Sequence, residues 1–304
     1  MDLCNPSYVK ELLAKYGLAP KKGFGQNFLI NTAVPEKIAQ ASSSFAPSNK
    51  PKGVLEIGPG VGALTQYLAE EYDKVVAVEI DNGLIPLLAE VFGDNENVEI
   101  VNTDFMKLDL PAFMNEHFGD IIADGGSVGV CANLPYYITT PVIMKLLESY
   151  LASERLPYTS IVVMVQLEVA RRLASKAGKG DYGSVTASVS LRADVTKLFD
   201  VSAGNFHPVP KVASAVIGII PNGGITEVYP ECGTDADAFA SRVSDVIAAA
   251  FNQRRKTLVN ALSGIYPKDK TVSVLSALGI REDVRGEALS PREFCLITDA
   301  LSNE

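Results

Sequence analysis

The chain has 304 residues, of which 47% are hydrophobic and 21% are charged, as is usual for a globular protein with a substantial core. Its formal net charge of −9 argues against nucleic acid as a partner of the surface as a whole. It contains no apolar run of about 18 residues and no signal-peptide core near its first residue, so we expect a cytoplasmic protein without a membrane partner.

Cysteine and histidine are both scarce. The four cysteines lie far apart and form no CxxC pair, so we expect free thiols in a reducing compartment and neither disulfides nor a zinc site. The chain has two histidines, His117 and His207. A histidine-based catalytic triad and a histidine-rich metal site are therefore both unexpected, and no metal is predicted.

Short β-rich runs alternate with helical patterns in the first half of the chain. The expected strands cover residues 54–58, 74–80, 98–104, 129–134 and 160–166. The expected helices cover residues 63–72, 83–92 and 142–151. Strands that alternate with helices are typical of a parallel sheet covered on both faces, so we predict an α/β fold.

The pattern changes after residue 183. Residues 184–202 and 212–221 are predicted to be long strands with no helix between them, and they suit an antiparallel end to the sheet. Residues 221–235 are rich in glycine and proline, which is typical of a linker.

Four helical patterns follow this linker. They cover residues 237–253, 254–265, 271–280 and 290–302. In the last of them Ser290 is a candidate N-cap, with Pro291 at the first helical position and Glu293 three residues after the cap. We therefore predict an α/β domain over residues 1–221 and a small all-helical domain over residues 222–304.

The run VLEIGPGVGALT (residues 54–65) predicts a strand, a glycine-rich turn and the start of a helix. Glycines let the backbone approach a ligand closely, and the helix N-terminus offers unpaired N–H groups. Gly58, Gly60 and Ala63 satisfy the looser fingerprint for a dinucleotide such as NAD. Glu79 could then hold a ribose.

The other interpretation of this turn is a site for S-adenosylmethionine (SAM). Glu56 lies two residues before the first glycine of a G-x-G-x-G run, the usual pattern for SAM. Glu79 would accept hydrogen bonds from both ribose hydroxyls, and Asp104 would accept one from the adenine amine. Both lie at the ends of predicted strands, at the edge where open α/β sheets bind ligands. The glycines alone do not choose between NAD and SAM.

The run CANLPYYITTP (residues 131–141) favours SAM. The exocyclic amine of adenine is a poor nucleophile, because its lone pair is delocalised into the ring. The Asn133 side chain and the Leu134 carbonyl could accept its two protons and aim the lone pair at a methyl sulfonium. Pro135 fixes the backbone, and Tyr136 offers a flat face for a flipped base. No histidine base is needed, because the nitrogen becomes acidic as it is methylated.

A second aromatic residue, Phe206, precedes two prolines in the run NFHPVPKVASAV (residues 205–216). A rigid loop framed by prolines could present its ring to the other face of the base. The alternative is a loop phenylalanine that packs at the seam between domains. Tyr137, the second tyrosine of the earlier run, is assigned no role other than packing.

These motifs resemble a known family. They are GFGQNFLIN (23–31), LEIGPGVGALT, VEID (78–81), ANLPYYITTP, DYGSVT (181–186), FHPVPKVASAV and FNQRRKTLVNAL (251–262), and they occur in the family's order. From around residue 20 to its C-terminal end, the chain is similar to the KsgA/RsmA family of small-subunit rRNA dimethyladenosine transferases. One departure is QLE (166–168), where many members have Q-K-E.

The resemblance implies a Rossmann-like class I SAM-dependent methyltransferase with a seven-stranded, mostly parallel sheet and a helical, rRNA-binding C-terminal domain. It implies SAM as methyl donor and dimethylation of N6 of two adjacent adenosines in the 3′-terminal hairpin loop of 16S rRNA. The implied partner is 16S rRNA within the immature 30S subunit, which would link the enzyme to ribosome biogenesis. A monomer is expected.

The resemblance also supplies cofactor-binding residues. Asn27 and Leu29 would contact SAM, Leu29 through its backbone, although the GQNF run taken alone is more typical of a loop before a helix. The remaining SAM positions of the family match Gly58, Glu79, Asp104 and Asn133.

Local basic patches would have to carry RNA binding, because the net charge is negative, and we expect that binding to be strongly salt-sensitive. The candidates are Lys21, Lys22, Arg171, Arg172 and residues 254–256. For an isolated cluster of this kind, a solvated helix face is the ordinary interpretation.

Two other functions stay open. One is an Erm-type 23S rRNA adenine-N6 methyltransferase, against which the F-x-P-x-P-K-V-x-S-A-V and FNQRRKTL runs count. The other is a non-catalytic ribosome assembly factor on the same fold, against which the intact cofactor and turn residues count. An NAD enzyme is the weakest alternative, because no residue supplies an acid for hydride transfer.

Overall fold

The computed structural model describes residues 2–19, 27–135, 137–152, 158–232, 235–253 and 255–302. The chain forms two compact units. The first consists of residues 1–170 and 196–220, and the second of residues 171–195 and 221–304. Most of the sheet belongs to the first unit, and the second is mostly helical. The predicted division into domains at residue 221 stays a prediction.

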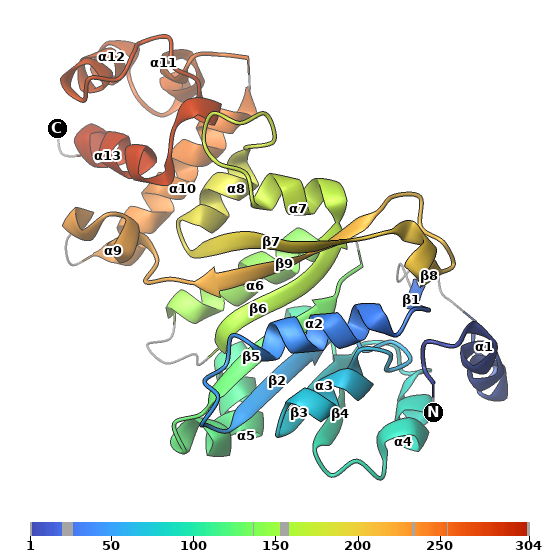
Figure 1. Cartoon of the computed structure of the whole chain (residues 1–304). Coiled ribbons are helices and arrows are strands. Elements are labelled where there is room, and N and C mark those ends of the chain that lie inside the picture. Colours follow the sequence, from blue (N-terminus) through green and yellow to red (C-terminus); the bar gives the residue numbers. More distant parts are fainter. Residues whose placement is uncertain are drawn as a thin grey trace. The chain divides into compact units, whose positions relative to one another are not determined.

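Among the described residues, seven strands form the main sheet in the order β4-β3-β2-β5-β6-β9-β7 (Figure 1). They are β2 Lys52–Ile57, β3 Lys74–Glu79, β4 Val98–Asn102, β5 Ser127–Asn133, β6 Tyr158–Gln166, β7 Ala193–Val201 and β9 Ser214–Pro221. β2 pairs in parallel with β3 and β5, β3 with β4, and β5 with β6, whereas β9 is antiparallel to β6. The predicted mostly parallel sheet with an antiparallel end is confirmed.

Among the described residues, six helices lie wholly within the first unit, and α7 Leu167–Leu173 continues from it into the second. The six flank this sheet or precede it. They are α1 Pro6–Lys15, α2 Ala33–Ser43, α3 Thr65–Glu71, α4 Ile85–Phe92, α5 Leu110–Ala123 and α6 Thr139–Ala152. α3, α4 and α6 confirm the predicted helices. The others were not predicted, although capping residues mark two of them: Asn5 Oδ1 accepts the Ser7 N–H at 3.0 Å, and Asp109 Oδ1 accepts the Ala112 N–H at 3.1 Å.

Helices cover both faces of the sheet. In Figure 1, α2 and α3 lie over the face turned to the viewer, and α5 and α6 lie behind it. In β2 and β3 every residue after the first is buried, whereas the edge strand β4 has no buried residue. Strands buried on both faces require continuous apolar runs, and each fully buried valine, leucine or isoleucine contributes roughly 1.5–3 kcal/mol.

Residues 184–202 do not form one long strand, so that prediction is wrong. They form α8 Ser184–Ser190 followed by β7. Thr186 is fully buried, and its hydroxyl donates to the Arg172 carbonyl at 2.8 Å, while the Gly183 N–H donates to Thr186 Oγ1 at 3.3 Å. The alternating β-branched residues imitate a strand, but these contacts with a preceding segment stabilise the helix.

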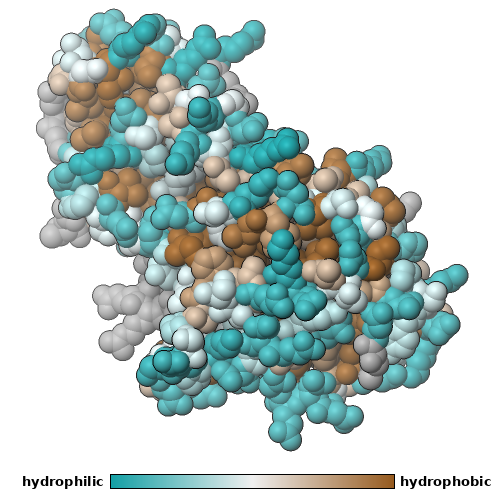
Figure 2. Space-filling model, in the orientation of Figure 1, coloured by the Kyte–Doolittle hydropathy of each residue, from teal (hydrophilic) through white to brown (hydrophobic). Residues whose placement is uncertain are grey.

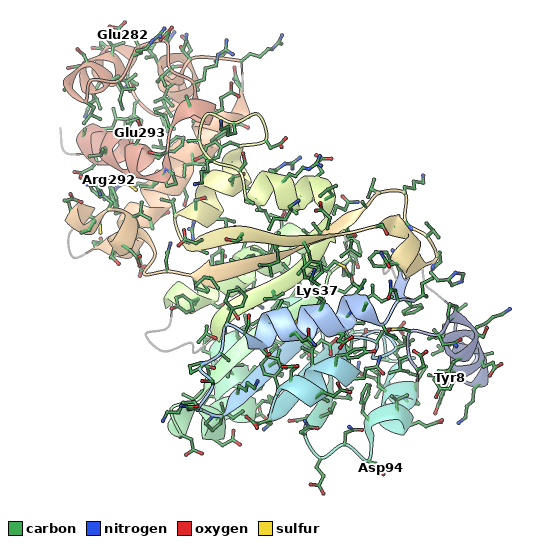
Figure 3. The ribbon with its side chains drawn as sticks, in the orientation of Figure 1. Tyr8, Lys37, Asp94, Glu282, Arg292 and Glu293 are labelled. Carbon is green, nitrogen blue, oxygen red and sulfur yellow. The ribbon has the colours of Figure 1, made fainter. Side chains whose placement is uncertain are left out.

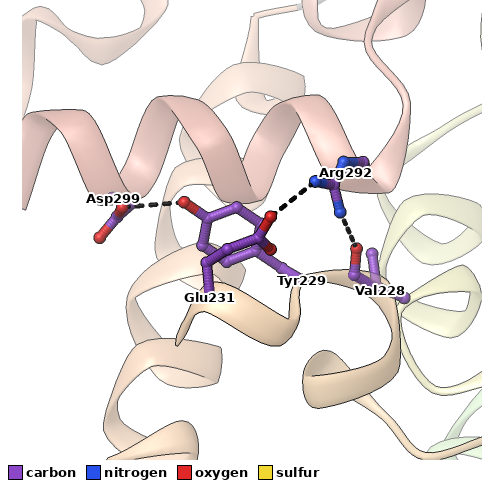
Figure 4. A network of polar contacts seen from close by, with 5 residues as sticks. All are labelled: Val228, Tyr229, Glu231, Arg292 and Asp299. Atoms are coloured by element: carbon purple, nitrogen blue, oxygen red, sulfur yellow. Dashed lines mark hydrogen bonds and ion pairs between the residues drawn. The ribbon is translucent and has the colours of Figure 1, made fainter. Parts of the chain in front are cut away.

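The sequence predicts a linker over residues 221–235, but much of this segment is packed. It carries α9 Ile225–Val228 and a 3₁₀ turn, η4 Pro230–Cys232. Tyr229 between them is 5% exposed, and its hydroxyl donates to Asp299 Oδ2 at 2.9 Å. Figure 4 shows this bond within a network of Val228, Tyr229, Glu231, Arg292 and Asp299. Apolar residues between the glycines and prolines anchor the segment to the helical core.

The C-terminal segment is helical, as predicted. Its helices are α10 Ala236–Asn252, α11 Leu258–Ala261, α12 Lys268–Ala277 and α13 Pro291–Ser302. The predicted capping of the last helix is confirmed, because the Ser290 N–H donates to Glu293 Oε2 at 2.7 Å and the Glu293 N–H donates to Ser290 Oγ at 3.3 Å (Glu293 is labelled in Figure 3). α11 is shorter than expected, and residue 254 lies outside the described residues.

Hydrophilic residues cover much of the face shown in Figure 2, and the hydrophobic areas between them are smaller. Within the described part of the chain, none of the helices has both the length and the apolar character needed to cross a membrane.

Candidate active site

A cavity lies in the first unit, at the carboxyl ends of β2, β3, β4 and β5, with about 1200 Å³ of space including its open mouth. Every predicted site residue that the structure describes lines it. These residues are Asn27, Leu29, Gly58, Glu79, Asp104, Asn133, Leu134, Pro135 and Phe206. Tyr136 lies outside the described residues. The structure therefore brings the predicted residues together, and the role of each one stays a prediction.

The glycine turn forms one wall of the cavity. Gly58 has a φ of 72°, a value that favours glycine, and its N–H donates to the Val78 carbonyl at 2.9 Å. A Cβ added to Gly58 would meet no atom within 4 Å, so open space lies beside this backbone. Gly62 differs, because a Cβ there would lie 2.4 Å from Phe92 Cε2. Gly58 thus leaves room for a ligand, whereas Gly62 allows close packing.

Glu79 ends β3 and holds the glycine turn. Its Oε2 accepts the Gly60 N–H at 3.2 Å, and its Oε1 accepts the Asp81 N–H at 2.7 Å. Burial raises the pKa of Glu79, and these two backbone hydrogen bonds oppose the rise. The carboxylate is therefore oriented before a ligand arrives and can still accept further hydrogen bonds from hydroxyls.

Glu56 is the most unusual titratable group of the cavity. It is 1% exposed, and its Oε2 has no hydrogen-bond partner among the described residues. Burial raises the pKa of Glu56 to about 8, and the nearby Glu79 carboxylate acts in the same direction. Burial therefore favours the uncharged form of Glu56, whereas a positive charge nearby would favour the ionised form.

Asp104 follows β4 and caps a 3₁₀ turn, η2 Phe105–Lys107. Its Oδ1 accepts the Met106 N–H at 3.0 Å, and its Oδ2 lies 3.8 Å from Lys107 Nζ. The cap fixes the carboxylate at the cavity wall. Asp104 can therefore accept a hydrogen bond from an amine in the cavity, as the sequence predicts.

The turn after β5 is held at several points. The Leu134 N–H donates to the Met164 carbonyl on β6 at 3.3 Å, and the Leu134 side chain is buried. The Pro135 carbonyl accepts the Ile138 N–H at 3.1 Å and the Thr139 hydroxyl at 3.3 Å. Within the described part of the chain, no group donates to the Leu134 carbonyl or to the Asn133 side chain. Both predicted acceptors are thus available to a base.

Phe206 lies on a two-stranded antiparallel sheet that lines the cavity. β1 Phe28–Leu29 pairs with β8 Phe206–His207, so that Leu29 is opposite Phe206. The Phe206 side chain is 2% exposed and belongs to the core of the first unit. It therefore contributes to the cavity wall here, and its stacking on a base stays a prediction.

Two exposed apolar residues of the cavity were not assigned from the sequence. Tyr137 is 63% exposed and Ile80 is 49% exposed, and both line the cavity. Tyr137, for which the sequence gives no role beyond packing, is thus largely exposed at the cavity. The sequence could have indicated Ile80, because this residue directly follows Glu79 at the end of a strand. An apolar side chain beyond the end of a strand cannot pack against the sheet, so it is available to contact a ligand.

The geometry fits SAM. The Glu79 and Asp104 carboxylates are acceptors for hydroxyls and an amine, and the space beside Gly58 admits a ligand close to the backbone. The unpaired oxygen of Glu56 suits a positively charged ligand. Among the described residues, no three His, Cys, Asp or Glu side chains are grouped to hold a metal ion.

Comparisons with known proteins agree with this fit. The family model of ribosomal RNA adenine dimethylase matches residues 17–303. The chain is 42% identical to ribosomal RNA small subunit methyltransferase A of Geobacillus thermodenitrificans, over 99% of this chain and 97% of that one. It is 40% identical to the protein of the same name from Shouchella clausii, over 99% of this chain and 96% of that one.

Two solved structures are also similar. A dimethyladenosine transferase from Plasmodium falciparum has a TM-score of 0.66 at 26% identity, and the match covers 88% of this chain and 95% of that one. The 23S rRNA methyltransferase ErmE has a TM-score of 0.64 at 23% identity, and the match covers 91% of this chain and all of that one (100%). At that identity, the likeness to ErmE shows the fold alone.

The sheet order and the cavity at its carboxyl edge define the protein as a Rossmann-like, SAM-dependent methyltransferase. The chain belongs to the ribosomal RNA adenine dimethylase family. It is therefore an enzyme that methylates adenine in ribosomal RNA with SAM as the methyl donor.

The substitution Gly58→Ala should abolish most SAM binding, because its Cβ would occupy the cavity and its positive φ strains the backbone. Gly17→Ala is the matched control: Gly17 has a φ of 65° and also no atom within 4 Å of an added Cβ, but it lies outside the cavity lining. Both variants should lose about 1 kcal/mol of stability. Calorimetric titration with SAM would count against this role of Gly58 if both variants bound equally well.

The substitution Glu56→Gln should change how stability depends on pH. The folded-state pKa of about 8 lies above that of the unfolded chain, near 4.5. Glu56 therefore favours folding at low pH, and this contribution is lost as pH rises between those values, by on the order of 1 kcal/mol per pH unit. Urea unfolding from pH 5 to 8 should show Glu56→Gln gaining stability relative to wild type. Glu116→Gln, at an exposed position of α5, should show no such trend.

Proposed function

We propose that the enzyme dimethylates N6 of two adjacent adenosines in the 3′-terminal hairpin loop of 16S rRNA. Its substrate would be the immature 30S subunit in the cytoplasm, which links it to ribosome biogenesis, and it would act as a monomer. The observation that carries the adenine chemistry is the pair of available acceptors, Asn133 and Leu134, beside the cofactor cavity. The small ribosomal subunit is favoured as the substrate because two relatives, which are 42% and 40% identical to this chain over 99% of its length, are named small subunit methyltransferases.

The residues at the turn would do three things. The Asn133 side chain and the Leu134 carbonyl accept the two N6 protons, so the nitrogen lone pair is turned out of conjugation and toward the cofactor side of the cavity. The Pro135 turn holds these acceptors in place before the base binds. SAM supplies the methyl group. The nitrogen lone pair would form the new C–N bond as the bond from the methyl group to the SAM sulfur breaks. The electron pair of that bond would go to the sulfur, which leaves as the neutral thioether S-adenosylhomocysteine, and the nitrogen would then release one proton to solvent.

The second methyl group poses no new demand on this geometry. After the first transfer N6 has one proton and one methyl group, so one acceptor still orients it. The exposed rim at Ile80 and Tyr137 leaves the mouth of the cavity open for a flipped base. Dimethylation is thus compatible with one site that is used twice.

RNA binding would depend on local positive charge. Arg171, Lys176 and Lys179 are exposed on the second unit, in a segment without acidic residues from 171 to 180. Lys21, Lys22 and residue 254 lie outside the described residues. Because the whole chain carries a net charge of −9, contacts with phosphates would be confined to local basic patches, and we expect salt to weaken the binding strongly.

Methylation of 23S rRNA is the first alternative, but the likeness to ErmE shows the fold alone and does not favour it. That likeness reaches 23% identity, against 40–42% for the small-subunit relatives. A non-catalytic assembly factor would have no need of the available acceptors beside a cofactor cavity. We therefore favour the small-subunit enzyme.

The substrate is tested by incubating the protein with methyl-labelled SAM and either unmethylated 30S particles or free 23S rRNA, and by mapping the modified adenines. We expect dimethylated adenosines at two neighbouring positions of the 16S 3′-terminal hairpin and none in 23S rRNA. Labelling of 23S rRNA alone would overturn the proposal. SAM binding without any labelling would favour the assembly factor.

The substitution Asn133→Ala should reduce methyl transfer by roughly two to three orders of magnitude, the usual effect of removing one group that stabilises a transition state. Binding of SAM measured by calorimetry should stay within a few-fold of wild type. Asn115→Ala, at an exposed position of α5, is the matched control and should behave as wild type. Near-normal turnover by Asn133→Ala would refute the role of the two acceptors.

A further inference from the structure

Lys145 joins two walls of the cavity that are distant in sequence. It lies on α6, the helix that begins a few residues after the Pro135 turn. Its ammonium donates to the Met106 carbonyl at 2.8 Å and to the Leu108 carbonyl at 2.7 Å. It also lies 5.7 Å from the centroid of the Phe105 ring. These contacts all fall on the segment that directly follows Asp104.

This segment depends on Lys145 for its hydrogen bonding. Among the described residues, no other group donates to the Met106 or the Leu108 carbonyl. The two carbonyls lie at the end of the 3₁₀ turn and before the start of α5, where no helical N–H reaches them. Hydrogen bonds from a charged donor are stronger than neutral ones, so one partly buried ammonium satisfies both carbonyls.

The same helix is anchored to the turn that carries the acceptors. Thr139, at the first position of α6, is 2% exposed, and its hydroxyl donates to the Pro135 carbonyl. Asp104 and Met106 line one side of the cavity, and Leu134 and Pro135 line another. A continuous series of contacts therefore runs from the Asp104 turn through Lys145 and α6 to the Pro135 turn.

We propose that Lys145 is a positioning residue for the methyl transfer. By holding the Asp104 turn against α6, it keeps the wall that receives the adenine end of the cofactor in a fixed position relative to the acceptors for the substrate amine. The effect on the acceptors rests on the proposed function, whereas the effect on cofactor binding does not. Lys145 touches neither reactant in this account and acts through Asp104 and α6.

The test is Lys145→Met, which keeps most of the apolar stem and removes the ammonium. The affinity for SAM, measured by calorimetry without RNA, should fall roughly tenfold, which corresponds to about 1.4 kcal/mol. Hydrogen exchange of the backbone amides at residues 104–108 should become faster. In turnover assays KM for SAM should rise more than kcat falls. Lys145→Arg should recover most of the affinity, because a guanidinium can donate to two carbonyls.

Lys37→Met is the matched control. Lys37 lies on α2 (labelled in Figure 3), and its ammonium is 4.2 Å from the centroid of the Phe199 ring, away from the cavity lining. This variant should bind SAM as wild type does. Wild-type SAM affinity in Lys145→Met, or an equal loss in Lys37→Met, would overturn the proposal.

A second variant covers the case in which Lys145→Met does not fold. Lys145→Gln replaces the ammonium by a neutral amide on a shorter side chain, and it should give a SAM affinity between those of wild type and the tenfold-weakened value. If Lys145→Gln had the SAM affinity of wild type and the same amide exchange at residues 104–108, the proposal for Lys145 would also be overturned. Since these measurements need no RNA, they do not depend on which ribosomal RNA is the substrate.

Discussion

The parallel pairing of β2 with β3 and β5 is the constraint on which the rest of the molecule depends. It brings the ends of the three strands to one edge of the sheet, where a glycine turn, the Glu79 carboxylate and the Asn133 amide meet in one cavity. Burial of nearly continuous apolar runs on both faces fixes the strands, so their ends are positioned within a rigid frame. Catalytic geometry therefore follows from hydrophobic packing that takes no part in the chemistry.

Two buried carboxyl groups of this cavity differ in their hydrogen-bond partners. Glu79 accepts two backbone hydrogen bonds, which offset part of the cost of its burial, whereas one oxygen of Glu56 has no partner in the described chain. A cation in the cavity would complete the set of interactions that Glu56 lacks. The unpartnered oxygen is a local cost to stability, which is a common feature of functional sites.

Support for the site comes from residues that never meet the reactants. Thr139 holds the Pro135 carbonyl, and Lys145 holds the segment after Asp104, so both turns are fixed to one helix. The second unit is stabilised independently, by a core that includes Tyr229 and by the network around Arg292. The second unit thus has a hydrophobic core of its own.

The sequence by itself determined the alternation of strands and helices, the glycine turn, the acceptor turn and the cap of α13, because each depends on a short run of neighbouring residues. It failed at α8 and at residues 221–235, where contacts such as those of Thr186 and Tyr229 override local preference. Only the tertiary structure decided the raised pKa of Glu56, the exposure of Tyr137 and the contacts of Lys145, whose two carbonyl partners lie 37 and 39 residues away. Burial and electrostatic environment are set by partners distant in the chain, and no local pattern encodes them.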